Sequence, residues 1–146
     1  MQLREGHLIP DFILDALDGK DLVIYGEEDF ATSMCYVSDV VDGLLRLMHR
    51  AEYIGPCNIG DDKRFLMKEI AQKIIDMTES SSAIRFEPPI EFLTALGLPE
   101  LRKAREELGW VPLVRLEDGL RKTIDYTVAN KEAMNLAGEK EKENAE

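Results

Sequence analysis

Tyrosines are the side chains of this chain best suited to proton transfer, and their neighbours decide what they can do. On a helix, a tyrosine becomes an acid/base catalyst when a lysine one turn later stabilises its phenolate. No lysine stands four positions after any tyrosine here, so a Tyr-x-x-x-Lys pair cannot be built. An acyl-transfer triad also fails, because no histidine and nucleophile stand in a plausible array. We therefore expect no catalytic residue in this chain. The tyrosines are Tyr25, Tyr36, Tyr53 and Tyr126.

Glycine spacing excludes the common dinucleotide and phosphate sites. The sequence has 10 glycines, and no two of them are separated by a single residue. The G-x-G-x-x-G fingerprint is therefore absent, and so is the G-x-x-x-x-G-K-[ST] phosphate loop. We expect no cofactor-binding residue in this chain, because a bound pyrophosphate needs such a turn beneath it.

Cysteine and histidine are too sparse for a metal site or a disulfide scaffold. Cys35 and Cys57 are the only cysteines, and both lie in apolar, strand-like segments. His7 and His49 are the only histidines, and neither has a second ligand at metal spacing. We expect no metal ligands, and we expect both cysteines to be buried and reduced.

The charge balance argues against nucleic acid and membranes as partners. The formal net charge is −11, whereas phosphate-rich surfaces recruit basic proteins. Apolar runs are four or five residues long, such as Leu22 to Tyr25, and a bilayer span needs about 20. The first residues, MQLREGHLIPDF, lack the apolar core of a signal peptide. These observations predict a cytoplasmic protein.

Apolar periodicity predicts helices separated by short strands. Helices are expected at Leu8 to Leu17, Val40 to Arg50, Met67 to Met77, Pro99 to Leu108 and Leu116 to Met134. Strands are expected at Leu22 to Tyr25, Met34 to Val37, Cys57 to Ile59 and Ile84 to Phe86.

The second predicted helix and its neighbours carry specific expectations. Ser38 and Asp39 are good N-cap residues before it, and Asp39 is expected to cap it. Its apolar residues are expected on a buried side: Val40, Val41, Leu44, Leu45, Leu47 and Met48. Trp110 is expected to anchor the core between two helices.

Strands separated by helices indicate an α/β domain, or α+β for a chain in isolation. The strands are few and short for a complete α/β domain, so the sheet needs a partner to cover its edges. We expect one lobe over 1–135 and a disordered polar tail over 136–146, because the sequence ends AGEKEKENAE.

Four segments in order resemble one enzyme family. They are GHLIPDFILDALDGKDLVIYGEED, MCYVSDVVDGLLRLM, CNIGDD and KAREELGWVPLVRLEDGLRKTIDY. Together they resemble the extended short-chain dehydrogenase/reductases that act on nucleotide sugars, from about Gly6 to Tyr126. The resemblance is closest to UDP-glucuronate decarboxylases and dTDP-glucose 4,6-dehydratases, with nucleotide-sugar 4-epimerases nearby.

This resemblance implies the carboxyl-terminal, substrate-binding lobe of such an enzyme, without its Rossmann half. In the family, that half supplies the NAD site and the Tyr/Lys pair, so NAD is expected only with a Rossmann partner. The family's pattern places nucleotide-sugar contacts at positions 7, 8, 23, 25 and 58. These positions hold His7, Leu8, Val23, Tyr25 and Asn58, which would contact a UDP- or dTDP-sugar.

Simpler structural roles stay open for three of these residues. Tyr25 is also a plausible strand aromatic half-covered by the first helix. Asn58 could satisfy backbone groups before Gly60, and His7 could be a solvated residue at a helix start.

The chain departs from the family at two arginines that clamp the diphosphate. Thr32 and Gly97 stand at those positions. Two hypotheses therefore stay open. In the first, the chain is the nucleotide-sugar-binding portion of an NAD-dependent epimerase, dehydratase or decarboxylase, and is not catalytic alone. In the second, it is a non-catalytic remnant that acts as a self-associating or partner-binding module, for instance a homo-oligomer.

Overall fold

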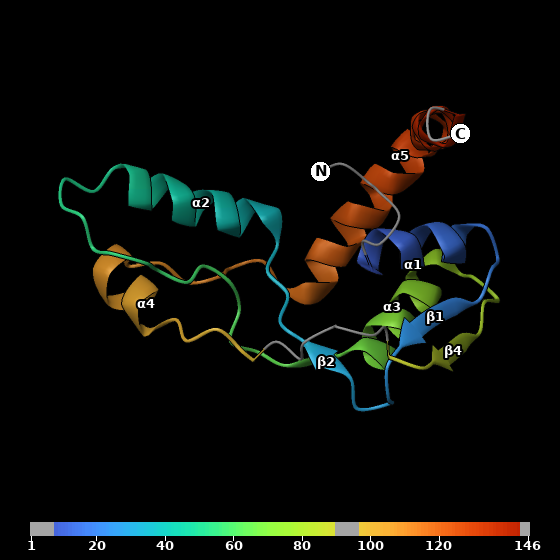
Figure 1. Ribbon diagram of the computed structural model, residues 1–146, viewed down its shortest axis with the longest axis horizontal. Coiled ribbons are helices and arrows are strands. Elements are labelled where there is room, and N and C mark those ends of the chain that lie inside the picture. Colours follow the sequence, from blue (N-terminus) through green and yellow to red (C-terminus); the bar gives the residue numbers. More distant parts are fainter. Residues whose placement is uncertain (1–7, 90–96, 144–146) are drawn as a thin grey trace.

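A computed structural model describes residues 8–89 and 97–143, with side chains described through 131. Its elements form two lobes, one around α1, β1, β4, α3 and α5 and the other around α2 and α4 (Figure 1). The helices are α1 (Leu8–Leu17), α2 (Val37–Met48), α3 (Met67–Thr78), α4 (Arg102–Leu108) and α5 (Leu116–Glu143). The strands are β1 (Leu22–Tyr25), β2 (Ala31–Thr32), β3 (Phe65–Leu66) and β4 (Ile84–Glu87). This mixture of helices and strands confirms the predicted fold class.

The larger core lies where α1, α3 and α5 pack together against β1. α1 has the bounds predicted from its periodicity, and Phe12, Ile13 and Ala16 are buried on one face. α3 buries Ile70 and Ile74 against them. Gly19 follows α1 with φ +68°, the left-handed conformation expected for the residue that ends this helix.

β1 and β4 form a two-stranded parallel sheet. Their register pairs Leu22 with Ile84 and Tyr25 with Glu87. Leu22 and Ile24 point into the core, so Val23 and Tyr25 lie on the opposite face of the strand. Both strands were predicted from the sequence.

A second, antiparallel pair of strands was not predicted. β2 and β3 are two residues each, and Ala31 pairs with Leu66. The expected strands at Met34 to Val37 and Cys57 to Ile59 are wrong, since neither segment has the hydrogen-bonded partner that defines a strand. Both segments instead lie beside the smaller core, against which Cys35, Cys57 and Ile59 pack.

The smaller core consists of Leu101, Ala104 and Trp110. Trp110 is 1% exposed, which confirms its predicted anchoring role. α4 begins at Arg102 rather than at Pro99, and Gly109 ends it with φ +57°. α2 packs on α4, so the two helices form one lobe around this core.

α2 differs from its prediction at its start and on its faces. It begins at Val37 with Tyr36 in the N-cap position and no side-chain cap. Asp39 is therefore inside the first turn and does not cap the helix. Asp39 and Gly43 are the buried residues of this helix, and most of the predicted buried side lies in solvent. The exposed residues of that set are Val41, Leu44, Leu45 and Met48.

α5 runs to Glu143, past the end predicted at Met134. Its backbone is thus helical through most of the segment 136–146, which we expected to be a disordered tail; 144–146 lie outside the described residues. The limits of the lobe, 1–135, stay a prediction. None of the helices in the described part of the chain is long and apolar enough to cross a membrane.

Candidate nucleotide-sugar site

The outward face of β1 holds two of the five predicted contact residues. Val23 is half-buried, whereas Tyr25 at the end of the strand is 46% exposed. The chain turns away at Gly26, whose φ of +147° suits only glycine, and the Gly26 N–H donates to the carbonyl of Glu87 at 2.9 Å. The Tyr25 ring is therefore presented at the carboxyl end of a parallel strand, where α/β sheets bind ligands.

The structure gives less support to a ligand-binding role for the other three predicted contact residues. Leu8 begins α1 and packs against the larger core. His7 lies outside the described residues. The Asn58 side chain is exposed, and its Nδ2 donates to the Glu100 carbonyl at 3.2 Å. This bond fits the structural role left open for Asn58, because the amide holds a neighbouring backbone segment.

The two positions that lack the family's arginines lie on different segments. Thr32 is on β2, and its hydroxyl donates to the Ser33 carbonyl at 3.4 Å. Gly97 is exposed, and a Cβ built on it would meet nothing within 4 Å. Arg64 directly precedes β3, the strand that pairs with β2. Its Nη2 donates to the Asp29 carbonyl at 2.9 Å. This arginine braces the turn before β2.

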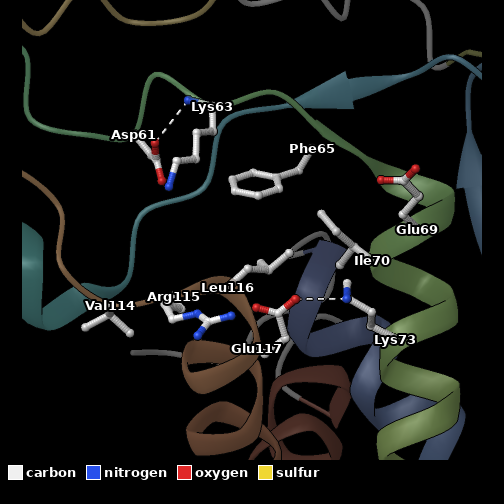
Figure 2. Close-up of a pocket in the computed structure, with 10 residues that line it drawn as sticks. All are labelled: Asp61, Lys63, Phe65, Glu69, Ile70, Lys73, Val114, Arg115, Leu116 and Glu117. Atoms are coloured by element: carbon white, nitrogen blue, oxygen red, sulfur yellow. Dashed lines mark hydrogen bonds and ion pairs between the residues drawn. The ribbon is translucent and has the colours of Figure 1, made fainter.

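A cavity of about 300 Å³ lies between the segment before β3, the helix α3 and the start of α5 (Figure 2). None of the predicted contact residues lines it. Its apolar wall includes the Phe65 ring and the side chains of Ile70 and Leu116. Its charged residues balance, with three cations and three carboxylates: Lys63, Lys73, Arg115, Asp61, Glu69 and Glu117.

Two of the three carboxylates in this cavity are held by hydrogen bonds. Lys73 Nζ donates to Glu117 Oε1 at 2.9 Å, which lowers the pKa of Glu117 below its ordinary value. Asp61 is 6% exposed, and its Oδ1 accepts the Lys63 N–H at 3.0 Å. A carboxylate with a lowered pKa stays ionised at neutral pH, so Glu117 cannot serve as a general acid there. Within the described residues, no cluster of His, Cys, Asp and Glu could hold a metal ion.

Asp39 has a role that the sequence did not predict. Its Oδ2 accepts the N–H groups of Leu113 at 3.0 Å and Val114 at 2.9 Å, and its carbonyl accepts Trp110 Nε1–H at 2.9 Å. One residue on α2 thus fixes the segment that leads from α4 to α5. A local signal could not reveal this, because its partners lie more than 70 positions away in the chain.

Cys35 lies close to this network and is half-buried. Burial raises the pKa of its thiol to about 11, and the carboxylates of Asp39 and Asp61 contribute to the rise. Both cysteines are free, as predicted, but Cys35 and Cys57 are half-buried rather than fully buried. A thiol with a raised pKa has a smaller thiolate fraction at neutral pH than an ordinary cysteine, and is therefore a weaker nucleophile.

Comparison with known proteins identifies the relatives of this fold. Residues 1–60 match the NAD dependent epimerase/dehydratase family. The UDP-glucuronic acid decarboxylase 1 of Danio rerio is 39% identical over 126 residues, which are 86% of this chain and 30% of the decarboxylase. The chain therefore spans about a third of the length of the curated relatives it matches.

Solved structures agree with the sequence matches. An epimerase from Methanothermobacter thermautotrophicus superposes with a TM-score of 0.85 at 27% identity, over 90% of this chain and 40% of the epimerase. The Bordetella bronchiseptica enzyme WbmF, solved with NAD+ and UDP, gives 0.82 at 28% identity, over 94% of this chain and 42% of the enzyme. The chain is thus a relative of the NAD-dependent epimerase/dehydratase family and has the fold of the corresponding part of its short-chain dehydrogenase/reductase structures.

Proposed function

We propose that this chain is the nucleotide-sugar-binding portion of an NAD-dependent epimerase, dehydratase or decarboxylase, and that it does not catalyse a reaction alone. The observation that carries the proposal is the exposed ring of Tyr25 beside Val23 at the carboxyl end of β1. An aromatic ring there can stack on a nucleotide base, and the neighbouring valine can cover its edge. A UDP- or dTDP-sugar is the ligand class that fits, with Leu8, His7 and Asn58 as further predicted contacts.

The strength of binding follows from one gain and one loss. Stacking of a base on an aromatic side chain is worth about 1–3 kcal/mol. Thr32 and Gly97 stand where the family has arginines, so two charge-assisted contacts of about 1.5–3 kcal/mol each are missing. Their loss weakens diphosphate binding by a factor on the order of 10² or more, and the negative net charge opposes it further. We therefore expect weak binding that depends mainly on the base.

The residues present do not fit NAD. In the described part of the chain, β1 is followed by Gly26 alone, and the next glycine is Gly43 inside α2. No strand there runs through a glycine-rich turn into a helix, which is the geometry that cradles a pyrophosphate. Turnover would require a cofactor-binding portion from elsewhere. The purified chain should release no NAD on denaturation, and tightly retained NAD would contradict this assignment.

Titration calorimetry with UDP and with dTDP tests the proposal directly. We expect weak saturable binding of at least one nucleotide to the wild-type chain. Tyr25→Ala should weaken it about tenfold or more, the loss of about 1.4 kcal/mol of stacking. Tyr53→Ala is the matched control, because Tyr53 is 93% exposed and lies beyond α2. Absence of binding at millimolar nucleotide, or equal losses in both variants, would refute the site.

A second function has an observation in its favour. Apolar side chains of α2 lie in solvent, which suits a self-associating or partner-binding module.

We also propose a cytoplasmic location for the protein, supported by the free thiols of Cys35 and Cys57. Fractionation of the source cells with a reducing-compartment marker would test the location, and recovery of the protein with a secreted marker would contradict it.

A further inference from the structure

Glu87, the last residue of β4, lies beside Tyr25 on the outward face of the β1–β4 sheet. The two residues are Cα partners in the parallel register, and the Gly26 N–H donates to the Glu87 carbonyl at 2.9 Å. Ile84 and Phe86, the alternate residues of β4, line a hollow with side chains of α3. Because side chains alternate along a strand and paired strands lie about 4.8 Å apart, the Glu87 side chain stands next to the Tyr25 ring.

The Glu87 carboxylate is available to a ligand. Glu87 is exposed, and among the residues that the structure describes no hydrogen bond or ion pair engages its carboxylate. The neighbouring charge on the same face of β4 is already paired, because Arg85 Nε lies 2.6 Å from Asp21 Oδ2. A carboxylate accepts hydrogen bonds and donates none. The face that presents the Tyr25 ring thus also presents an acceptor, which a ligand can meet without breaking a contact of the protein.

Uracil and thymine carry a group that such an acceptor recognises. Each base has a single ring N–H, at N3, and the polar atoms on either side of it are carbonyl oxygens, which only accept. A base stacked on the Tyr25 ring with N3 toward β4 therefore donates to the Glu87 carboxylate, and this bond is charge-assisted. Stacking alone leaves the rotation of the base in its own plane free, because every base has a π-face. The carboxylate fixes that rotation.

We propose that Glu87 determines the base specificity of this site by accepting the N3–H of a uracil or thymine stacked on Tyr25. The inference rests on the proposed function, because it needs the base on that ring. It goes further by assigning a residue that reads the edge of the base, whereas Tyr25 binds its face. Glu87 is not among the contacts expected from the family's pattern, and the register of β1 and β4 is what brings it to the site.

Ligand-observed NMR titration with UDP and with 3-methyluridine 5′-diphosphate tests the role of N3–H. The methyl group removes the donor and leaves the ring and the diphosphate in place. For the wild-type chain, the dissociation constant of the methylated nucleotide should be about five to ten times that of UDP. In Glu87→Ala this ratio should fall to about one, whereas Glu87→Gln, whose amide oxygen still accepts, should keep part of it. General charge repulsion cancels in the ratio, because both nucleotides carry the same diphosphate.

Glu27→Ala is the matched control, because Glu27 is an exposed carboxylate that follows Gly26, beyond the end of β1. It should keep the wild-type ratio, and circular dichroism verifies that each variant is folded. A wild-type ratio near one, an unchanged ratio in Glu87→Ala, or an equal fall in Glu27→Ala would overturn the assignment of Glu87 and leave base stacking on Tyr25 intact. Failure of the wild-type chain to bind UDP, or full binding by Tyr25→Ala, would instead refute the proposed function, and the role of Glu87 would fall with it.

Discussion

Replacing Asp39 by alanine should destabilise the connection between α2 and the segment that follows α4. The carboxylate accepts two backbone N–H groups, from Leu113 and Val114, at 3.0 and 2.9 Å. Alanine removes both acceptors and leaves the two donors to find water. Asp39 is 7% exposed, so its carboxylate makes these bonds away from bulk solvent.

The expected cost follows from these two bonds. A hydrogen bond to a charged group contributes about 1.5–3 kcal/mol, so the pair is worth about 3–6 kcal/mol before compensation. Leu113 is exposed and Val114 half-buried, and water can therefore solvate part of what is lost. We expect a net loss of about 2–3 kcal/mol in the free energy of unfolding for Asp39→Ala, which lowers the Tm by about 5–10 °C. Asp39→Asn keeps one acceptor oxygen without the charge and should cost about half as much.

Urea unfolding followed by tryptophan fluorescence measures this cost at the affected segment. Trp110 is the only tryptophan of the chain, and its Nε1 donates to the carbonyl of Asp39. Asp125→Ala, which removes an exposed carboxylate from α5, is the control and should change stability by less than about 0.5 kcal/mol. If Asp39→Ala changes stability no more than this control, the assigned role of the carboxylate is wrong.

Two further predictions concern a close contact and a thiol. Gly43→Ala should cost about 1–3 kcal/mol, because its new methyl group would lie 2.9 Å from Ile59, whereas Gly97→Ala has open space and should be nearly neutral in the same unfolding assay. Equal effects of the two substitutions would show that α2 does not pack as described. Cys35, with a pKa raised to about 11, should be about 1% thiolate at pH 9, so its alkylation by iodoacetamide in a Cys57→Ser variant should keep rising beyond pH 10. A rate that levels off near pH 9 would contradict the burial of this thiol.

The sequence predicted the larger core well, because each of its elements has its cover inside the chain. α1, β1 and α3 were found with their bounds within a residue or so, since apolar spacing and burial agree there. β2 and β3 were missed because two-residue strands leave no periodic signal. Asp39 had the residue type and position of a helix cap, and only the folded chain brings residues 113 and 114 within its reach.

The candidate site was predictable only in part, for a related reason. The exposure of Tyr25 follows from strand alternation, which the sequence already contains. The bond from Asn58 to Glu100 joins segments 42 positions apart, so no local pattern reveals it. The outward face of α2 was also predicted wrongly, because helical periodicity identifies an apolar face but not what covers it.

The division of this molecule into two separate cores has a consequence for how it comes apart. Leu101, Ala104 and Trp110 form a small cluster, whereas the larger cluster draws on α1, β1, α3 and α5. A unit with few buried contacts opens at a lower free energy than its neighbour, so the α2–α4 lobe should melt first as a separate cooperative unit. Fluorescence from Trp110 would then report an earlier transition than circular dichroism of the whole chain, and a single "stability" would not describe the protein. Amide protons of α3 should outlast those of α2 in hydrogen exchange.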